Sequence, residues 1–190
     1  MSDDFDTTGS CEAMLSQFRL TNALVARLSE EQACLPTRLG SWRVVELVAH
    51  ISASLVFVQR AVATWASDGT ETSPLHWYRY ADEFARLIDE QTRAAAAPGW
   101  AQVRDSMMKR LVDVEGLLAE EDLGRVVVVG NDRMTLEAMC TTRCVEVVLH
   151  TLDMVAATSM SCPLDARALE IVRRYVKVAE NGASLIRAEL

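Results

Sequence analysis

Hydrophobic residues recur every three or four positions through most of the chain, a spacing that places them on one face of an α-helix. In the first such segment Met14, Phe18, Val25 and Leu28 follow this period. The same pattern, together with the positions of proline and glycine, predicts helices at about residues 10–28, 43–66, 78–96, 100–120, 136–157 and 165–190.

Helix caps and one strand-like run refine this pattern. Ser10 and Ser41 stand where the first two helices begin, and we expect both hydroxyls to accept hydrogen bonds from the first helical turn. Residues 125–135, RVVVVGNDRMT, combine a β-branched run with a Gly-Asn turn and predict a small β-hairpin. Residues 1–9 are polar and acidic, so we expect a flexible tail followed by a single domain over residues 10–190.

Two of the predicted helices are apolar around most of their circumference. They are the segments 43–66 and 136–157, and both carry many valine and leucine residues. A helix of this kind is buried, so the two should face each other inside a bundle. The expected fold class is therefore all-α, a four-helix bundle with additional short helices.

The stretch TTRCVEVVLHTLDM, residues 141–154, interrupts its apolar surface with Arg143, Glu146, His150 and Asp153. At about 100° per residue these four side chains lie within roughly a quarter of the helix circumference. Glu146 and His150 are one turn apart and can converge on one point. A buried carboxylate and imidazole are costly unless they are paired or bound to a metal. Taken alone, this weak motif leaves both a metal site and an internal hydrogen bond open.

A second histidine strengthens the metal interpretation. His50 lies in the middle of the other very apolar helix and should look across at Glu146 and His150. Two imidazoles and one carboxylate leave one position open, which is typical of catalytic rather than structural zinc. The remaining histidine, His76, stands in a predicted loop, where we expect it to be exposed.

Three charged residues near these ligands have candidate supporting roles. We expect Asp153 to accept the free N–H of His150, with a surface or capping aspartate as the alternative. Arg143 can steady Glu146 or hold a substrate carboxylate, and a salt bridge to another helix is an equal alternative. Glu46 fits a charge in the first helical turn better than a fourth ligand.

Composition excludes several classes of protein. The chain has 190 residues, a net charge of −8 and a pI near 4.9, which argues against a nucleic-acid binder and against docking on an anionic membrane. The most apolar run, residues 47–58, is too short to cross a bilayer, and the acidic N-terminus does not look like a signal peptide. Five cysteines without a CxxC pair indicate reduced thiols in a cytoplasmic protein. The oligomeric state is left open.

Two segments, SWRVVELVAHI and TLEAMCTTRCVEVVLHTLDMVAAT, carry a resemblance to a known family. A tryptophan stands eight residues before a helical histidine, and a later helix reads T-R-x-x-E-x-x-x-H-x-x-D. The segment LSEEQACLP is also similar to the family's sequence ahead of the tryptophan. In these features the chain resembles the N-terminal domain of mycothiol-dependent maleylpyruvate isomerases, within the DinB-like superfamily. The matching residues are Trp42, His50, Thr142, Arg143, Glu146, His150 and Asp153.

The resemblance implies a DinB-like four-helix bundle in which His50, Glu146 and His150 bind zinc or another divalent metal. It also implies mycothiol as a cosubstrate. Two positions depart from the family: Arg43 replaces a capping threonine, for which Ser41 can substitute, and Thr151 replaces a glycine. Complete maleylpyruvate isomerases carry a further C-terminal domain, so we expect a different or broader electrophile here.

The chemistry of such a centre defines the expected function. A thiol that binds a zinc ion held by two imidazoles and one carboxylate loses its proton near neutral pH and becomes a nucleophile. Attack on an electrophile then gives S-transfer, or cis–trans isomerisation of a maleylpyruvate-like alkene. The expected partners are a small-molecule thiol and an electrophilic substrate. A metal-dependent hydrolase and a non-catalytic metal-binding regulator are the alternatives.

Overall fold

The computed structural model describes residues 5–64, 71–75, 81–130 and 132–180. Most of this part of the chain is helical, as the hydrophobic period predicts, and a single two-stranded sheet joins it. The elements are α1 (Ser10–Val25), α2 (Glu30–Ala33), α3 (Val44–Val62), α4 (Ala81–Ala96), α5 (Trp100–Ala119), β1 (Val126–Val129), β2 (Asp132–Thr135), α6 (Leu136–Thr158) and α7 (Ala166–Glu180).

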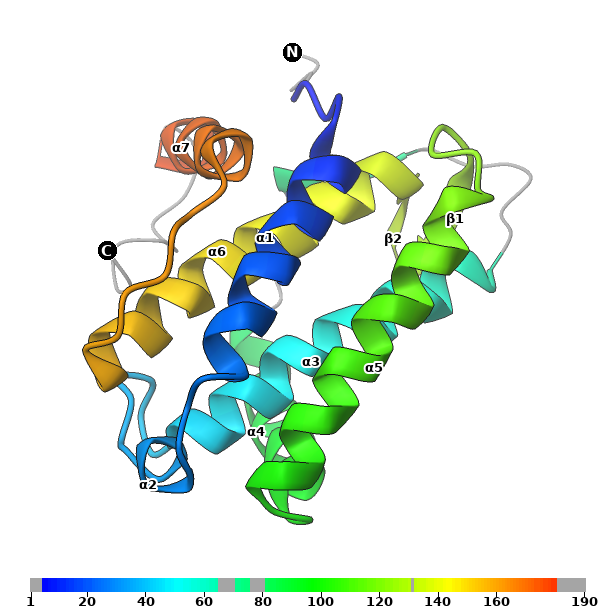
Figure 1. Ribbon diagram of the computed structural model, residues 1–190. Coiled ribbons are helices and arrows are strands. Elements are labelled where there is room, and N and C mark those ends of the chain that lie inside the picture. Colours follow the sequence, from blue (N-terminus) through cyan, green and yellow to red (C-terminus); the bar gives the residue numbers. More distant parts are fainter. Residues whose placement is uncertain (1–4, 65–70, 76–80, 131, 181–190) are drawn as a thin grey trace.

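Four helices, α1, α3, α5 and α6, form the bundle (Figure 1). Helix α1 packs against α5 and α6, and α3 packs against the same two helices. The two central helices α3 and α6 are neighbours, as the apolar surfaces of both segments predicted. They run in opposite directions (Figure 1). Helix α4 lies against α3, and α7 covers α1 and α6. The expected all-α four-helix bundle is confirmed.

The apolar surface of α3 is explained by its place in the bundle. Leu47, Val48 and Leu55 are completely buried there, and their burial stabilises the fold by about 1.5–3 kcal/mol for each large side chain. The helix is longer than the apolar run 47–58, and by length and composition it could cross a membrane, contrary to our expectation. However, 67% of its most apolar window is already buried against the other helices.

The N-terminus of α1 differs from the prediction. Gly9, with φ of 73°, is the N-cap, and it makes no side-chain cap. The Ser10 hydroxyl instead accepts a hydrogen bond from Thr141 Oγ1 of α6 at 2.8 Å. The expected Ser10 cap is therefore wrong, because the serine begins the helix and faces the bundle interior.

The N-terminus of α3 also differs from the prediction. Arg43 is its N-cap, and the Arg43 backbone N–H donates to Glu46 Oε2 at 2.9 Å. Ser41 does not cap the helix; its hydroxyl accepts from Arg93 of α4 at 2.5 Å. A glutamate in the first turn can reach back to the cap residue and replace a serine or threonine cap. Glu46 lies in the first turn of α3, which agrees with its expected role as a charge that stabilises the helix dipole.

The predicted hairpin is confirmed, and it leads directly into α6. Strand β1 pairs with β2 in an antiparallel register that runs from Val126 opposite Thr135 to Val129 opposite Asp132. Thr135 then caps α6, since its hydroxyl accepts the Ala138 N–H at 3.1 Å. The hairpin thereby fixes where α6 begins, the helix that carries Arg143, Glu146, His150 and Asp153.

The residues before α1 make contacts with α7. The Phe5 ring packs edge-on against Tyr175 with 5.9 Å between centroids, and Asp6 forms an ion pair with Arg174 at 3.4 Å. Flexibility of the tail stays a prediction for residues 1–4, which lie outside the described residues.

Candidate metal centre

Three candidate ligands meet between α3 and α6. One donor atom from each of His50, Glu146 and His150 lies within 4.8 Å of the other two. Glu146 Oε2 is 3.4 Å from His50 Nε2 and 3.1 Å from His150 Nε2. The sequence prediction that these three side chains converge is confirmed by this geometry; that they bind a metal stays a prediction.

The helices account for the convergence. Glu146 and His150 are one turn apart on α6 and therefore project from the same face. The neighbouring helix α3 presents His50 to that face, and the two imidazole rings meet at right angles, with 5.0 Å between centroids and 80° between planes.

A hydrogen bond fixes how His150 is oriented. Its Nδ1 lies 3.0 Å from Asp153 Oδ2, and a carboxylate only accepts, so we assign the Nδ1 proton to this bond. In the neutral ring, the Nε2 lone pair then faces the carboxylate oxygen of Glu146. Two lone pairs at this distance need a cation between them, either a proton or a metal ion.

The carboxylate of Glu146 provides a test of whether a metal fits. Its Oε2 atom is buried and makes no hydrogen bond with any described residue, although two imidazole nitrogens lie near it. Unless a proton or a metal ion lies between this oxygen and an imidazole nitrogen, the buried oxygen is unsatisfied, which is costly. A divalent cation shared by the two imidazoles and the carboxylate would satisfy it with ligands that zinc prefers.

The same proximity shifts the pKa values of both α6 residues. Burial raises the pKa of Glu146, but the His150 and His50 imidazoles and the Arg143 charge outweigh it and hold the pKa well below its usual range. Burial lowers the pKa of His150, but the carboxylates of Asp153 and Glu146 outweigh it and raise the pKa to about 9. Without a metal, the centre therefore holds a proton on His150 near neutral pH.

Asp153 lies behind His150, as expected for a residue that orients a ligand. Its side chain is only 3% exposed, and its second oxygen, Oδ1, forms an ion pair with Arg38 Nε. Burial raises the pKa of Asp153, while His150 and Arg38 outweigh that effect and lower it. The alternative of a surface aspartate is wrong. A functional role for Asp153 stays a prediction.

Arg143 is buried beside the cluster. Its Nη2 lies 4.0 Å from Glu146 Oε1, and its guanidinium lies over the ring of Phe57, 5.5 Å from the centroid. The contact with Glu146 is long for an ion pair, so Arg143 contributes charge more than a directed hydrogen bond. Phe57 is 37% exposed, so the ring that the buried guanidinium packs on reaches the surface of the bundle.

Sequence reasoning missed two residues that contact this centre. Arg38 is 115 positions from Asp153, and no local pattern signals that pairing. Trp42, to which our sequence analysis assigned no role, packs on His50 with 5.0 Å between ring centroids and donates its indole N–H to Asp89 of α4. The spacing of eight residues between Trp42 and His50 was the available signal.

The other candidate groups that the structure describes lie away from the cluster. Glu46 pairs with Arg43 at 2.8 Å and is not a fourth ligand. His76 lies outside the described residues. Cys140 and Cys144 are buried, and burial raises the pKa of the Cys144 thiol to about 12, as expected for an inert thiol. All five cysteines are free.

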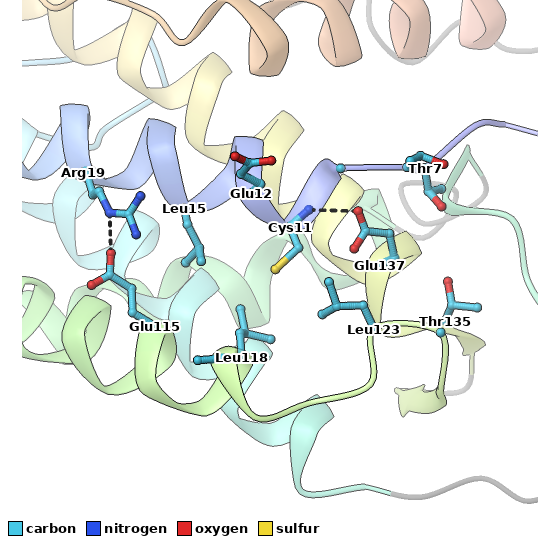
Figure 2. A pocket seen from close by; sticks show the side chains of 14 residues that line it. Thr7, Cys11, Glu12, Leu15, Arg19, Glu115, Leu118, Leu123, Thr135 and Glu137 are labelled. Atoms are coloured by element: carbon cyan, nitrogen blue, oxygen red, sulfur yellow. Dashed lines mark hydrogen bonds and ion pairs between the residues drawn. The ribbon is translucent and has the colours of Figure 1, made fainter.

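A cavity of about 780 Å³ lies elsewhere, between α1, α5 and the beginning of α6 (Figure 2). Leu15 and Leu118 form apolar walls, and the Cys11 N–H donates to Glu137 Oε1 at 3.2 Å. None of the candidate metal ligands lines it. Figure 2 shows these side chains around the cavity.

Comparison with solved structures supports the fold. One is the crystal structure of a mycothiol-dependent maleylpyruvate isomerase, with a TM-score of 0.62 at 12% identity, covering 91% of this chain and 68% of the other. Another is a histidine-to-alanine mutant of a mycothiol-dependent maleylpyruvate isomerase, with a TM-score of 0.64 at 11% identity, covering 95% and 74%. Identities this low establish the fold alone.

Sequence comparison establishes the family. A search of curated proteins finds no match. Residues 15–155, which contain all three candidate ligands, match the family described as the mycothiol maleylpyruvate isomerase N-terminal domain. This span includes α3 and almost all of α6. The resemblance read from the two motifs is thereby confirmed, and the chain belongs to the mycothiol maleylpyruvate isomerase N-terminal domain family.

Proposed function

We propose that the protein is a zinc-dependent enzyme that activates mycothiol, or a similar low-molecular-weight thiol, for attack on an electrophile. One observation carries this proposal: two imidazole nitrogens converge on a buried carboxylate oxygen that has no hydrogen bond of its own among the described residues. In a chain of this family, such a donor set is best explained as a metal centre.

His50, Glu146 and His150 would hold the ion. With two neutral imidazoles and one carboxylate, bound zinc would supply a net positive charge that lowers the pKa of a thiol and favours the nucleophilic thiolate. His150 uses Nε2 for this purpose because Asp153 holds its Nδ1 proton. Glu146 is ionised at neutral pH, since the surrounding cations keep its pKa low.

Arg143 adds a second positive group to the site. We propose that it steadies Glu146 and attracts a carboxylate of the electrophile, for which a guanidinium is well suited. Phe57 lies over the guanidinium from α3, so an anionic substrate would approach past this aromatic ring.

The reaction itself has two branches. Addition of the thiolate sulfur to a conjugated alkene forms a C–S bond, rotation follows, and expulsion of the thiolate regenerates the alkene as its other isomer. Displacement of a leaving group instead transfers the carbon group to sulfur. A maleylpyruvate-like substrate fits the first branch, and an alkyl electrophile fits the second.

A screen of the zinc-loaded protein with mycothiol tests this proposal. We expect thiol-dependent consumption of an activated alkene or an alkyl electrophile, lost on chelation and in Glu146→Gln, which keeps the side-chain volume but removes the charge. Hydrolysis of an ester or amide without thiol would replace the proposal by a hydrolase. Tight metal binding with neither activity would replace it by a metal-binding regulator.

A further inference from the structure

We propose that the loop of residues 36–43 sets the geometry of the metal centre, with Arg38 and Trp42 as its positioning residues. This inference rests on the proposed metal site. Arg38 acts on His150 through Asp153, and Trp42 acts on His50 directly. One short loop would thus orient the histidine ligands of both helices.

Arg38 is connected to His150 through the two oxygens of one buried carboxylate, that of Asp153. We call this connection the Arg38 arm, and the contact of Trp42 with His50 the Trp42 arm. Asp153 Oδ1 pairs with Arg38 Nε, while Oδ2 takes the Nδ1 proton of His150 at 3.0 Å. Removal of Arg38 would leave Oδ1 of this buried group without its cation and free the carboxylate to rotate. Because the orientation of His150 depends on Oδ2, Arg38 controls the aim of His150 Nε2 without touching the ion.

The Trp42 arm is anchored to α4. The indole N–H donates to Asp89 Oδ1 at 2.7 Å, and Arg93 Nε holds the same carboxylate at 2.9 Å. Arg93 also donates to the Ser41 hydroxyl at 2.5 Å, so α4 forms hydrogen bonds with two neighbouring residues of the loop, Ser41 and Trp42. The indole ring also packs on His50, with 46° between ring planes, and limits the rotation of the imidazole.

Hydrogen bonds within and beside the loop join the two arms into one unit. Thr37 donates twice to the Trp42 carbonyl, from its backbone N–H at 2.9 Å and from its hydroxyl at 2.8 Å. The Leu39 N–H donates to the Thr37 hydroxyl at 3.1 Å, and the Val44 N–H donates to the Leu35 carbonyl at 2.9 Å. Arg38 and Trp42 are therefore held in a fixed relation to each other.

A metal centre with an open position needs such support. Its three ligands must be aimed within about 0.5 Å, and the described residues offer no fourth protein ligand to correct an error. Residues that orient a ligand typically change metal affinity by about 10–100-fold when they are removed. Most of the bundle core lies elsewhere, so the same changes should leave the fold intact.

Zinc affinity measured by chelator competition tests the Arg38 arm. We expect Arg38→Ala to lower the affinity by about 10-fold or more, and Arg38→Lys to recover part of the loss because its charge can still reach Asp153. The matched control is Arg19→Ala, which removes the partly exposed ion pair of Arg19 with Glu115 on another face of the bundle. This control should bind zinc as the wild type does.

The Trp42 arm is tested with two variants. Trp42→Phe keeps an aromatic ring against His50 but loses the bond to Asp89, and Trp42→Ala loses both contacts. We expect the alanine variant to bind zinc more weakly than the phenylalanine variant, and both to bind more weakly than the wild type. The absorption spectrum of the cobalt(II)-substituted protein reports ligand geometry. It should change in the Arg38 and Trp42 variants but not in the Arg19→Ala control.

The outcomes separate this inference from the proposed function. If the wild type and the folded Arg38 and Trp42 variants bind zinc equally and give the same cobalt spectrum, the loop does not position the ligands, and the proposed function stands. If the wild type binds no zinc, the metal centre and this inference both fail. Far-ultraviolet circular dichroism identifies any variant that has unfolded. If an alanine variant unfolds, the conservative variant at the same position, Arg38→Lys or Trp42→Phe, is measured in its place.

Discussion

Replacing His50 with alanine is expected to weaken zinc binding strongly while leaving the bundle folded. Zinc-finger sites with four ligands bind with about 10–16 kcal/mol, or roughly 2.5–4 kcal/mol for each ligand. At about 1.4 kcal/mol for each tenfold change, the loss of one ligand corresponds to about 10²–10³-fold in affinity. The remaining pair, Glu146 and His150, stands on one helix and can retain only weak binding.

The effect on folding should be much smaller. His50 keeps 18% of its side chain exposed, and its ring packs on Trp42, so truncation costs about 1–2 kcal/mol. Leu47, Ile51 and Leu55 on the same helix are at most 1% exposed and keep their contacts. Their burial is worth about 1.5–3 kcal/mol each, which holds α3 in the bundle.

Chelator competition for zinc and circular dichroism measure the two effects on one sample. The control is Gln59→Ala, a half-buried position on the same helix outside the cluster. Unchanged zinc affinity in a folded His50→Ala protein would refute His50 as a ligand. Loss of helix content in that variant would refute the argument that the apolar core folds without the centre.

Three further outcomes follow from the structure. Asp153→Asn should lower zinc affinity by about 10–100-fold; an unchanged competition curve would contradict its role behind His150. Because the pKa of His150 is raised to about 9, zinc binding near pH 7 should release about one proton from this ring, and the release should vanish as the pH rises through that value; calorimetry in buffers of different ionisation enthalpy counts it. Thr151→Val removes a 2.7 Å contact with Thr21 of α1 and should lower the free energy of unfolding by about 1 kcal/mol in urea, more than Thr158→Val, whose hydroxyl bonds to Met154 and Met160 stay near the C-terminal end of its own helix; equal losses would refute this prediction.

The periodic pattern was sufficient to predict the bundle and the meeting of three ligands. Glu146 and His150 follow from helical geometry alone, because residues four apart share a face. The position of His50 follows from burial, since α3 and α6 are both too apolar to stand at the surface. The hairpin was recognised from its β-branched run and Gly-Asn turn.

The caps were not predicted correctly, because more than one residue could fill each place. Ser10 and Ser41 both have the right side chain, but Gly9 is the N-cap of α1, and at the start of α3 Glu46 reaches back to Arg43. Tertiary partners decided the outcome: both serine hydroxyls accept hydrogen bonds from other helices. Local preference is weaker than such contacts.

The contacts around the ligands depend on distant parts of the chain. Arg38 meets Asp153 across 115 positions, and Trp42 meets Asp89 across 47. Neither pairing leaves a periodic signal, because both residues stand in a loop whose path is fixed only when α4 and α6 are packed. The supporting contacts of a centre are therefore harder to predict than its ligands.

Addition of mycothiol to the cobalt(II)-substituted protein tests the central claim most directly, namely that a thiol binds at the open position of a metal held by His50, Glu146 and His150. We predict that a thiolate-to-metal charge-transfer band appears and saturates with thiol, and that it is absent in Glu146→Gln under the same conditions. A spectrum that saturating thiol leaves unchanged, in protein shown to contain the metal, would contradict the account.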